Sequence, residues 1–164
     1  MRLSEHPLLK PHVGKPAILD SNLLLFSWCS DFHPALVSKF KRLSSFQIED
    51  VDLLSETLKV FPVLKTTPHV LTEVSNLANQ LPSWIKEDWS EHFSRQIQGI
   101  SEDWIPAATI AHNELFWLGL TDAGLAQLAS THVILTIDFP LSNSLESRGL
   151  NVINFTHLRS LWLE

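Results

Sequence analysis

Two aspartates in this sequence follow directly after short apolar stretches, at positions where α/β proteins often have catalytic or ligand-binding residues. Asp20 follows residues 16–19, and Asp138 follows residues 133–137. Both stretches have the length and composition of buried strands. In an open parallel sheet the functional crevice lies beyond the carboxyl ends of the strands, so both carboxylates emerge at one edge if their strands are neighbours. An aspartate between a strand and a helix is also a good helix N-cap, and for either residue alone this explanation stays open.

Two further acids occupy helix positions that allow them to join this pair. Glu73 lies on the flank of the apolar stripe of its predicted helix, so it need not face bulk water, although a solvated glutamate is the commoner case. Asp122 lies in the first turn of another predicted helix, just after its capping residue Thr121, where the helix dipole favours a negative charge whether or not it binds metal. Each acid alone has a structural explanation, whereas one metal-binding cluster accounts for all four.

The elements that must position these acids alternate between strands and helices. The predicted strands are residues 16–19, 62–67, 133–137 and 151–154, and the predicted helices are residues 23–30, 34–43, 47–60, 68–81, 83–99, 122–130, 140–149 and 156–163. Residues 104–110 stay ambiguous, because Pro106 would restrict a strand there to the edge of a sheet. The alternation predicts an α/β fold with a parallel sheet that is covered on both faces and connected by right-handed crossovers.

The composition indicates one domain with a substantial core, since 45% of the 164 residues are apolar. We expect residues 1–15 to form an amino-terminal extension and residues 16–164 to form the domain. The sequence shows neither an apolar run of the roughly 20 residues that span a membrane nor the apolar segment of a signal peptide, so we expect a cytoplasmic protein without membrane contact. The single cysteine, Cys29, excludes a disulfide framework within the chain and a cysteine-cluster metal site.

The net charge of −6 narrows the function classes. It disfavours a protein that coats nucleic acid non-specifically, because such a protein neutralises phosphates with many lysines and arginines. It is compatible with a metal-dependent nuclease, because the carboxylates that hold divalent metal make a small domain acidic.

Four short motifs, in this order and with this spacing, resemble the PIN domain family of metal-dependent ribonucleases. They are residues 18–22, 71–74, 120–123 and 135–138, and each contains one of the four acids. The resemblance extends over about residues 16 to 155, and residues 150–155 fit the closing strand of that fold. It implies a three-layer α/β/α sandwich with a central, mainly parallel sheet of four to five strands. It also implies that four catalytic carboxylates hold Mg²⁺ or Mn²⁺: Asp20, Glu73, Asp122 and Asp138.

The chemistry of such a site requires hydroxide near pH 7 and neutralisation of charge on the phosphoryl oxygens, both of which a pair of divalent ions supplies. Carboxylate oxygens suit hard Mg²⁺. We expect Asp20 and Asp138 to be shared inner ligands and Asp122 and Glu73 to form the wider shell. Asn22 and Thr136 lie close enough to the strand ends to orient carboxylates by hydrogen bonds. Without metal, mutual repulsion should raise the pKa of at least one acid above about 4.

The resemblance further implies RNA as the substrate. Many small members of the family are toxins of bacterial toxin–antitoxin modules, of the VapC type, and are silenced by a small antitoxin protein. We therefore expect such a toxin, with an antitoxin partner and a homodimeric state. Lys39, Lys41 and Arg42 form the densest basic patch, on the predicted second helix where the family places part of its substrate groove, although a solvated helix face is the preferred explanation. Trp28 and Phe32 are candidates for a dimer or partner surface.

Other functions stay open at this stage. A PIN-like fold can serve as a catalytically silent interaction module, or as a housekeeping RNA-processing nuclease outside any toxin module.

Two other classes of α/β protein are disfavoured by the sequence. A haloacid-dehalogenase-like phosphotransferase would need a second aspartate where this chain has Asn22. A response-regulator receiver would need a lysine at the end of a late strand, and none is evident.

Overall fold

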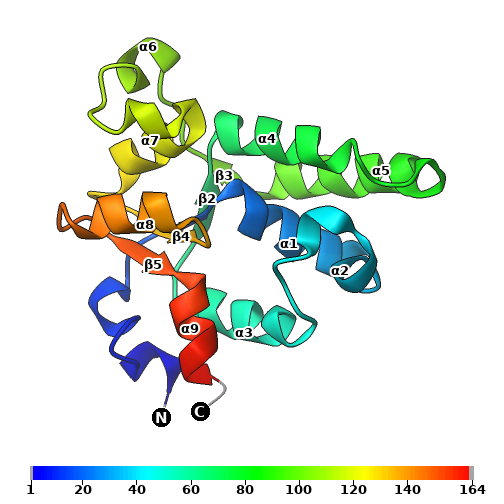
Figure 1. The fold of residues 1–164 in the computed structure, drawn as a ribbon, viewed down its shortest axis with the longest axis horizontal. Helices are drawn as coiled ribbons and strands as arrows, with labels where there is room; N and C mark the ends of the chain where they lie inside the picture. Colours follow the sequence, from blue (N-terminus) through cyan, green and yellow to red (C-terminus); the bar gives the residue numbers. More distant parts are fainter. Residues whose placement is uncertain (1, 163–164) are drawn as a thin grey trace.

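The computed structural model describes residues 2–162 and shows a five-stranded, all-parallel sheet with helices on both faces (Figure 1). The predicted class, a three-layer α/β/α sandwich, is confirmed. The strands lie in the order β3-β2-β1-β4-β5. Their bounds are β1 (Ala17–Leu19), β2 (Leu64–Thr66), β3 (Ser101–Glu102), β4 (Val133–Thr136) and β5 (Val152–Asn154).

The register of the central strands brings the two strand-end aspartates to one edge. β1 lies between β2 and β4 and is parallel to both, with Ala17 opposite Val133 and Leu19 opposite Leu135. Every residue of β1 and β4 is buried, as expected for parallel strands that are covered on both faces. Because the register aligns the ends of the two strands, Asp20 and Asp138 leave the sheet side by side.

Helices cover the sheet on two sides. In Figure 1, α7 and α8 lie on one side of the sheet, and α1 lies on the other side with α4 and α5. The longer helices are α1 (Ser21–Phe32), α3 (Glu49–Leu58), α4 (Pro68–Ala78), α5 (Ser83–Gly99), α7 (Leu120–Leu128), α8 (Phe139–Glu146) and α9 (Phe155–Trp162); α2 (Leu36–Lys39) and α6 (Ala107–Ile110) are single turns. Among residues 2–162, no helix has the length and apolar character that crossing a membrane requires.

The amino-terminal residues 2–15 pack against the domain. They form two 3₁₀ turns, Leu3–Glu5 and Lys10–His12, and the Leu9 side chain is completely buried in the core. The Lys15 ammonium donates to Asn151 Oδ1 at 2.8 Å. The segment is therefore anchored through both apolar burial and a polar contact.

One predicted helix is wrong, and one strand was not predicted. Residues 34–43 do not form one helix: α2 ends at Lys39, Phe40 is extended with its ring buried, and Lys41–Leu43 form a 3₁₀ turn. The edge strand is β3, ahead of the ambiguous residues 104–110, and Pro106 instead precedes the helical turn α6. A proline fits there because the first N–H groups of a helix lack intrahelical partners in any case.

The expected partner surface at Trp28 and Phe32 is wrong for Trp28. Trp28 is buried, with its ring 5.7 Å from that of Phe93, and Phe32 packs edge-on against Trp89. Helix α5 covers both rings, and the sequence does not show which face of α1 it contacts. Trp28 therefore belongs to the core, and Phe32 is half-buried and packs against it.

Candidate active site

A small acidic cavity lies at the carboxyl edge of the sheet and brings all four predicted acids together. Its volume is about 190 Å³. Of the described residues that line it, none is lysine, arginine or histidine. The lining consists of Asp20, Ser21, Asn22, Glu73, Leu118, Gly119, Thr121, Asp122 and Asp138.

Asp20 is buried and uses both of its carboxylate oxygens. Oδ1 accepts from the Leu23 N–H at 2.8 Å and caps α1, while Oδ2 accepts from the Ile137 N–H at 3.0 Å and from the Thr136 hydroxyl. Burial raises the pKa of this carboxyl to about 6, the three hydrogen bonds oppose that shift, and the charge of Asp138 adds to it. Asp20 is thus both a helix cap and a wall of the cavity.

Asp138 has the same double role. Its Oδ1 accepts from the Leu141 N–H at 2.8 Å and caps α8. Its own N–H donates to Thr136 Oγ1 at 2.9 Å, while the Thr136 hydroxyl donates to Asp20. One hydroxyl group therefore links the two strand-end aspartates, which is the contact expected of an orienting residue. The capping explanation is therefore correct for both residues, and both also line the cavity.

Glu73 reaches the cavity from α4 and is held by a residue that the sequence did not single out. Its Oε2 accepts from the Ser21 hydroxyl at 2.6 Å, and the Ser21 side chain is buried. Asn22, which was expected to orient a carboxylate, is exposed and only lines the cavity. The signal for Ser21 was its place directly after Asp20. Choosing between Ser21 and Asn22 requires knowing which side of α1 faces α4, and the sequence does not show that.

Asp122 shows the mutual influence of the four acids most clearly. Its pKa is raised to about 7, first by burial and then by the charges of Asp138, Asp20 and Glu73. The predicted raised pKa is therefore present, but burial contributes more to it than the predicted repulsion does. Since the described lining of the cavity carries no positive charge, a bound cation would favour the charged form of these carboxylates.

The turn that places Asp122 depends on a glycine. Gly119 precedes α7 with φ 105° and ψ 163°, a conformation that is essentially restricted to glycine. The helix therefore begins at Leu120, and Thr121, predicted to cap the helix, lies inside it and is buried. Gly119 thereby directs the first turn of α7, and with it Asp122, toward the strand ends.

The acids share the cavity without forming a closed ligand cage. Within residues 2–162, no three acidic, histidine or cysteine side chains are grouped closely enough to hold a metal ion as they stand. Protein donors occupy both oxygens of Asp20 and one oxygen each of Asp138 and Glu73. The donor set nevertheless consists of oxygens, which hard Mg²⁺ and Mn²⁺ prefer. In charge and in donor type the residues fit a divalent cation.

The basic patch predicted to contact substrate lies outside this cavity. Lys39, Lys41 and Arg42 are exposed, and none of them lines the cavity. They do not share a helix, because Phe40 interrupts it. The Arg42 Nε donates to Gln80 Oε1 at 2.8 Å. Their contact with RNA stays a prediction.

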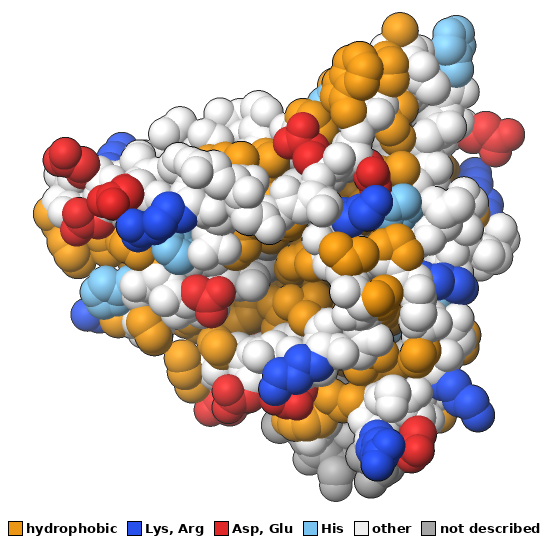
Figure 2. All heavy atoms as spheres, turned by 180° about the vertical axis from the view of Figure 1, so that it is seen from behind, with side chains coloured by type: hydrophobic (Ala, Val, Ile, Leu, Met, Phe, Trp, Pro, Cys, Tyr) orange, Lys and Arg blue, Asp and Glu red, His pale blue; other side chains and the backbone are white. Residues whose placement is uncertain are grey.

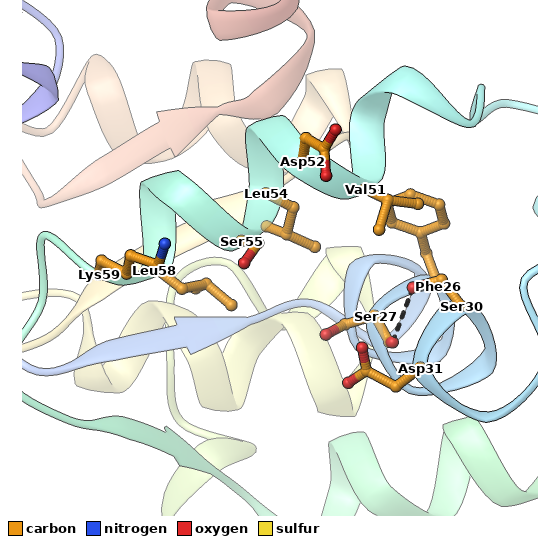
Figure 3. A pocket seen from close by; sticks show the side chains of 10 residues that line it. All are labelled: Phe26, Ser27, Ser30, Asp31, Val51, Asp52, Leu54, Ser55, Leu58 and Lys59. Carbon is orange, nitrogen blue, oxygen red and sulfur yellow. Dashed lines mark hydrogen bonds between the residues drawn. The ribbon is translucent and has the colours of Figure 1, made fainter.

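A second, larger hollow of about 420 Å³ lies between α1 and α3 (Figure 3). Its apolar lining comes from Phe26, Val51, Leu54 and Leu58, and its polar lining from Ser27, Ser30, Asp31, Asp52, Ser55 and Lys59. Figure 2, a space-filling view from behind, shows apolar side chains at the bottom of a recess. Lysines and arginines are scattered singly around that recess.

No model of a known protein family matches this chain, and no curated protein sequence matches it either.

Proposed function

We propose that this protein is a metal-dependent ribonuclease of the PIN type, with its active site in the acidic cavity. One observation carries the proposal: four carboxylates from four separate elements line one small cavity whose described lining contains no cationic side chain. The parallel sheet supports the proposal, because it delivers two of these acids to the edge where such folds bind ligands.

The four acids Asp20, Glu73, Asp122 and Asp138 would hold Mg²⁺ or Mn²⁺. When bound, the metal supplies a water of lowered pKa and positive charge for the phosphoryl oxygens. The chain's own contribution is positioning: Thr136 fixes Asp20, and Ser21 fixes Glu73. Asp122, with its pKa near 7, carries a proton for part of the time at neutral pH and must release that proton to act as a ligand.

The finer assignment is a cytoplasmic toxin of a toxin–antitoxin module that acts on RNA as a homodimer and is silenced by a small antitoxin. The motif resemblance supports this assignment. Recovery of the native protein from its host should yield a small partner whose binding stops cleavage. Recovery of a partner that leaves cleavage unchanged would favour a housekeeping nuclease.

Cleavage of single-stranded RNA by the purified protein tests the proposal. We expect cleavage with Mg²⁺ or Mn²⁺ and none in EDTA, and a loss of orders of magnitude for Asp138→Asn. An asparagine at position 138 can still cap α8, so the fold is retained. The matched control is Asp52→Asn, which removes one charge from the other hollow and should cleave like the parent. A folded parent protein that never cleaves RNA would favour the silent interaction module.

A further inference from the structure

The hollow between α1 and α3 is built from the facing sides of these two helices. Its lining recurs at helical spacing, with residues 27, 30 and 31 on α1 and residues 51, 54, 55 and 58 on α3. Residues three and four apart share one face of a helix. The volume of about 420 Å³ lies within the range of small-molecule sites. The hollow shares no lining residue with the acidic cavity, so it is a separate candidate site.

Two hydroxyl groups and one carboxylate from the facing helices lie between apolar side chains. Figure 3 shows Ser27 and Asp31 extending from α1 on the side where Ser55 and Leu58 extend from α3. Ser30 donates to the Ser27 carbonyl at 2.9 Å. In contrast, the hydrogen bonds and ion pairs within residues 2–162 involve none of the side-chain oxygens of Ser27, Asp31 and Ser55. Three acceptor groups in the hollow therefore lack a protein donor in the described part of the chain.

The charges around the hollow favour a cation. Lys59 lines it but is paired with Glu56. The carboxylate of Asp52 is turned away from α1 in Figure 3, so Asp31 is the acid that faces the space. Burial raises the pKa of Asp31 and the charge of His92 lowers it, although His92 does not line the hollow. A cation in the hollow would stabilise the charged form of Asp31.

We propose that this hollow binds a primary alkylammonium ion, a small organic amine. An ammonium group has three N–H donors and no acceptor, which matches the carboxylate of Asp31 and the hydroxyl oxygens of Ser27 and Ser55. The alkyl chain then covers the apolar lining, which comes from Phe26, Val51, Leu54 and Leu58. An anionic ligand would be repelled by Asp31, and a neutral alcohol would leave that carboxylate without a counter-charge.

Titration of the isotope-labelled protein with n-hexylamine at pH 7, followed through its backbone amide NMR signals, tests this inference. The amine is protonated at this pH, because a primary amine has a pKa of about 10. We expect saturable shifts in the residues that line the hollow. Affinity should rise about fourfold for each CH₂ group added between butylamine and hexylamine. The neutral analogue 1-hexanol should bind about 10-fold more weakly than hexylamine.

Asp31→Asn separates an ionic contact from a general change in the hollow. The variant should bind hexylamine about 10-fold more weakly and should bind 1-hexanol like the parent. The matched control is Asp88→Asn, which removes the same charge from an exposed position on α5 and should bind both ligands like the parent. Melting temperatures equal to the parent's establish that both variants are folded.

Three results would overturn the inference. The first is a parent protein that binds no hexylamine at millimolar concentration. The second is a set of shifts confined to the acidic cavity, around Leu118 and Gly119, that Asp31→Asn does not change. The third is an Asp31→Asn variant that binds hexylamine and 1-hexanol with the parent's affinities. None of these results bears on the proposed ribonuclease function, because the two sites have separate linings.

Discussion

The acidic cavity and the hollow between α1 and α3 differ in how their charges interact. The hollow is more than twice as large, about 420 Å³ against about 190 Å³. In the hollow, burial raises the pKa of Asp31 and the neighbouring His92 lowers it, while Lys59 is paired with Glu56. In the cavity, burial and three other carboxylates all raise the pKa of Asp122. The candidate site is distinguished by the mutual repulsion of its carboxylates and not by its volume.

The origin of the acids explains this difference. Asp31 and Asp52 lie on two helices, at the surface of the groove between them (Figure 3). Asp20 and Asp138 follow neighbouring parallel strands, so the sheet register fixes them beside each other. A parallel sheet gathers polar residues at its carboxyl edge, whereas two packed helices leave theirs dispersed.

Metal-dependent melting should give the largest difference between the two regions. Mn²⁺ at one hundred times its dissociation constant stabilises the parent by about 2.7 kcal/mol, which is about 5–10 °C in melting temperature for a domain of this size. Asp122→Asn should lose most of that gain, and Asp52→Asn should keep it. If Mn²⁺ raises the melting temperature of both variants equally, the acidic cavity does not bind Mn²⁺ in preference to the hollow.

Removing the backbone freedom of Gly119 should damage the cavity through the backbone of its lining. Gly119→Ala must hold an alanine at φ 105°, which costs about 1–3 kcal/mol of folding stability or shifts the start of α7. We expect a lower melting temperature in EDTA and a smaller response to Mn²⁺. Gly99→Ala is the matched control, because Gly99 ends α5 without a positive φ and an added Cβ would meet open space there. Equal effects of the two substitutions would contradict a special role for Gly119.

The pH dependence of stability should be smaller and should also separate the regions. A raised pKa means that folded Asp122 binds more protons than the unfolded chain, so metal-free stability falls as the pH rises from about 4 toward 7. Allowing for partial solvent screening, Asp122→Asn should recover about 1–2 kcal/mol at pH 8 in EDTA. Asp31→Asn should recover less stability, because the charge of His92 opposes the effect of burial on the Asp31 pKa. Melting in EDTA across pH 5–8 measures this, and a larger gain for Asp31→Asn would refute the coupling.

Much of this arrangement was predictable from local sequence. An apolar run that ends in an aspartate and then turns helical describes both Asp20 and Asp138, and the hydrophobic period of α4 placed Glu73 beside its apolar stripe. These signals depend only on neighbours along the chain. They were enough to predict the carboxyl edge of the sheet and the four acids that line the cavity there.

The remaining features depend on tertiary contacts or on very short elements. β3 has only two residues, too few for any periodicity to indicate it. Phe40 ends α2 because its ring is buried, a reason that lies outside the local pattern. The hydrogen bond from Ser21 to Glu73 joins positions 52 residues apart, and only the packing of α1 on α4 creates it.

Calorimetric titration with Mn²⁺ at pH 6.5, in two buffers of different ionisation enthalpy, tests the central claim most directly. If the four acids form one metal site, the parent binds Mn²⁺ and releases a substantial fraction of a proton, because Asp122 with its pKa of about 7 must lose its proton to become a ligand. Asp122→Asn should bind more weakly and release almost none, while Asp52→Asn should match the parent. A parent that binds no Mn²⁺, or an Asp122→Asn variant that binds with the same affinity and the same proton release, would contradict the account.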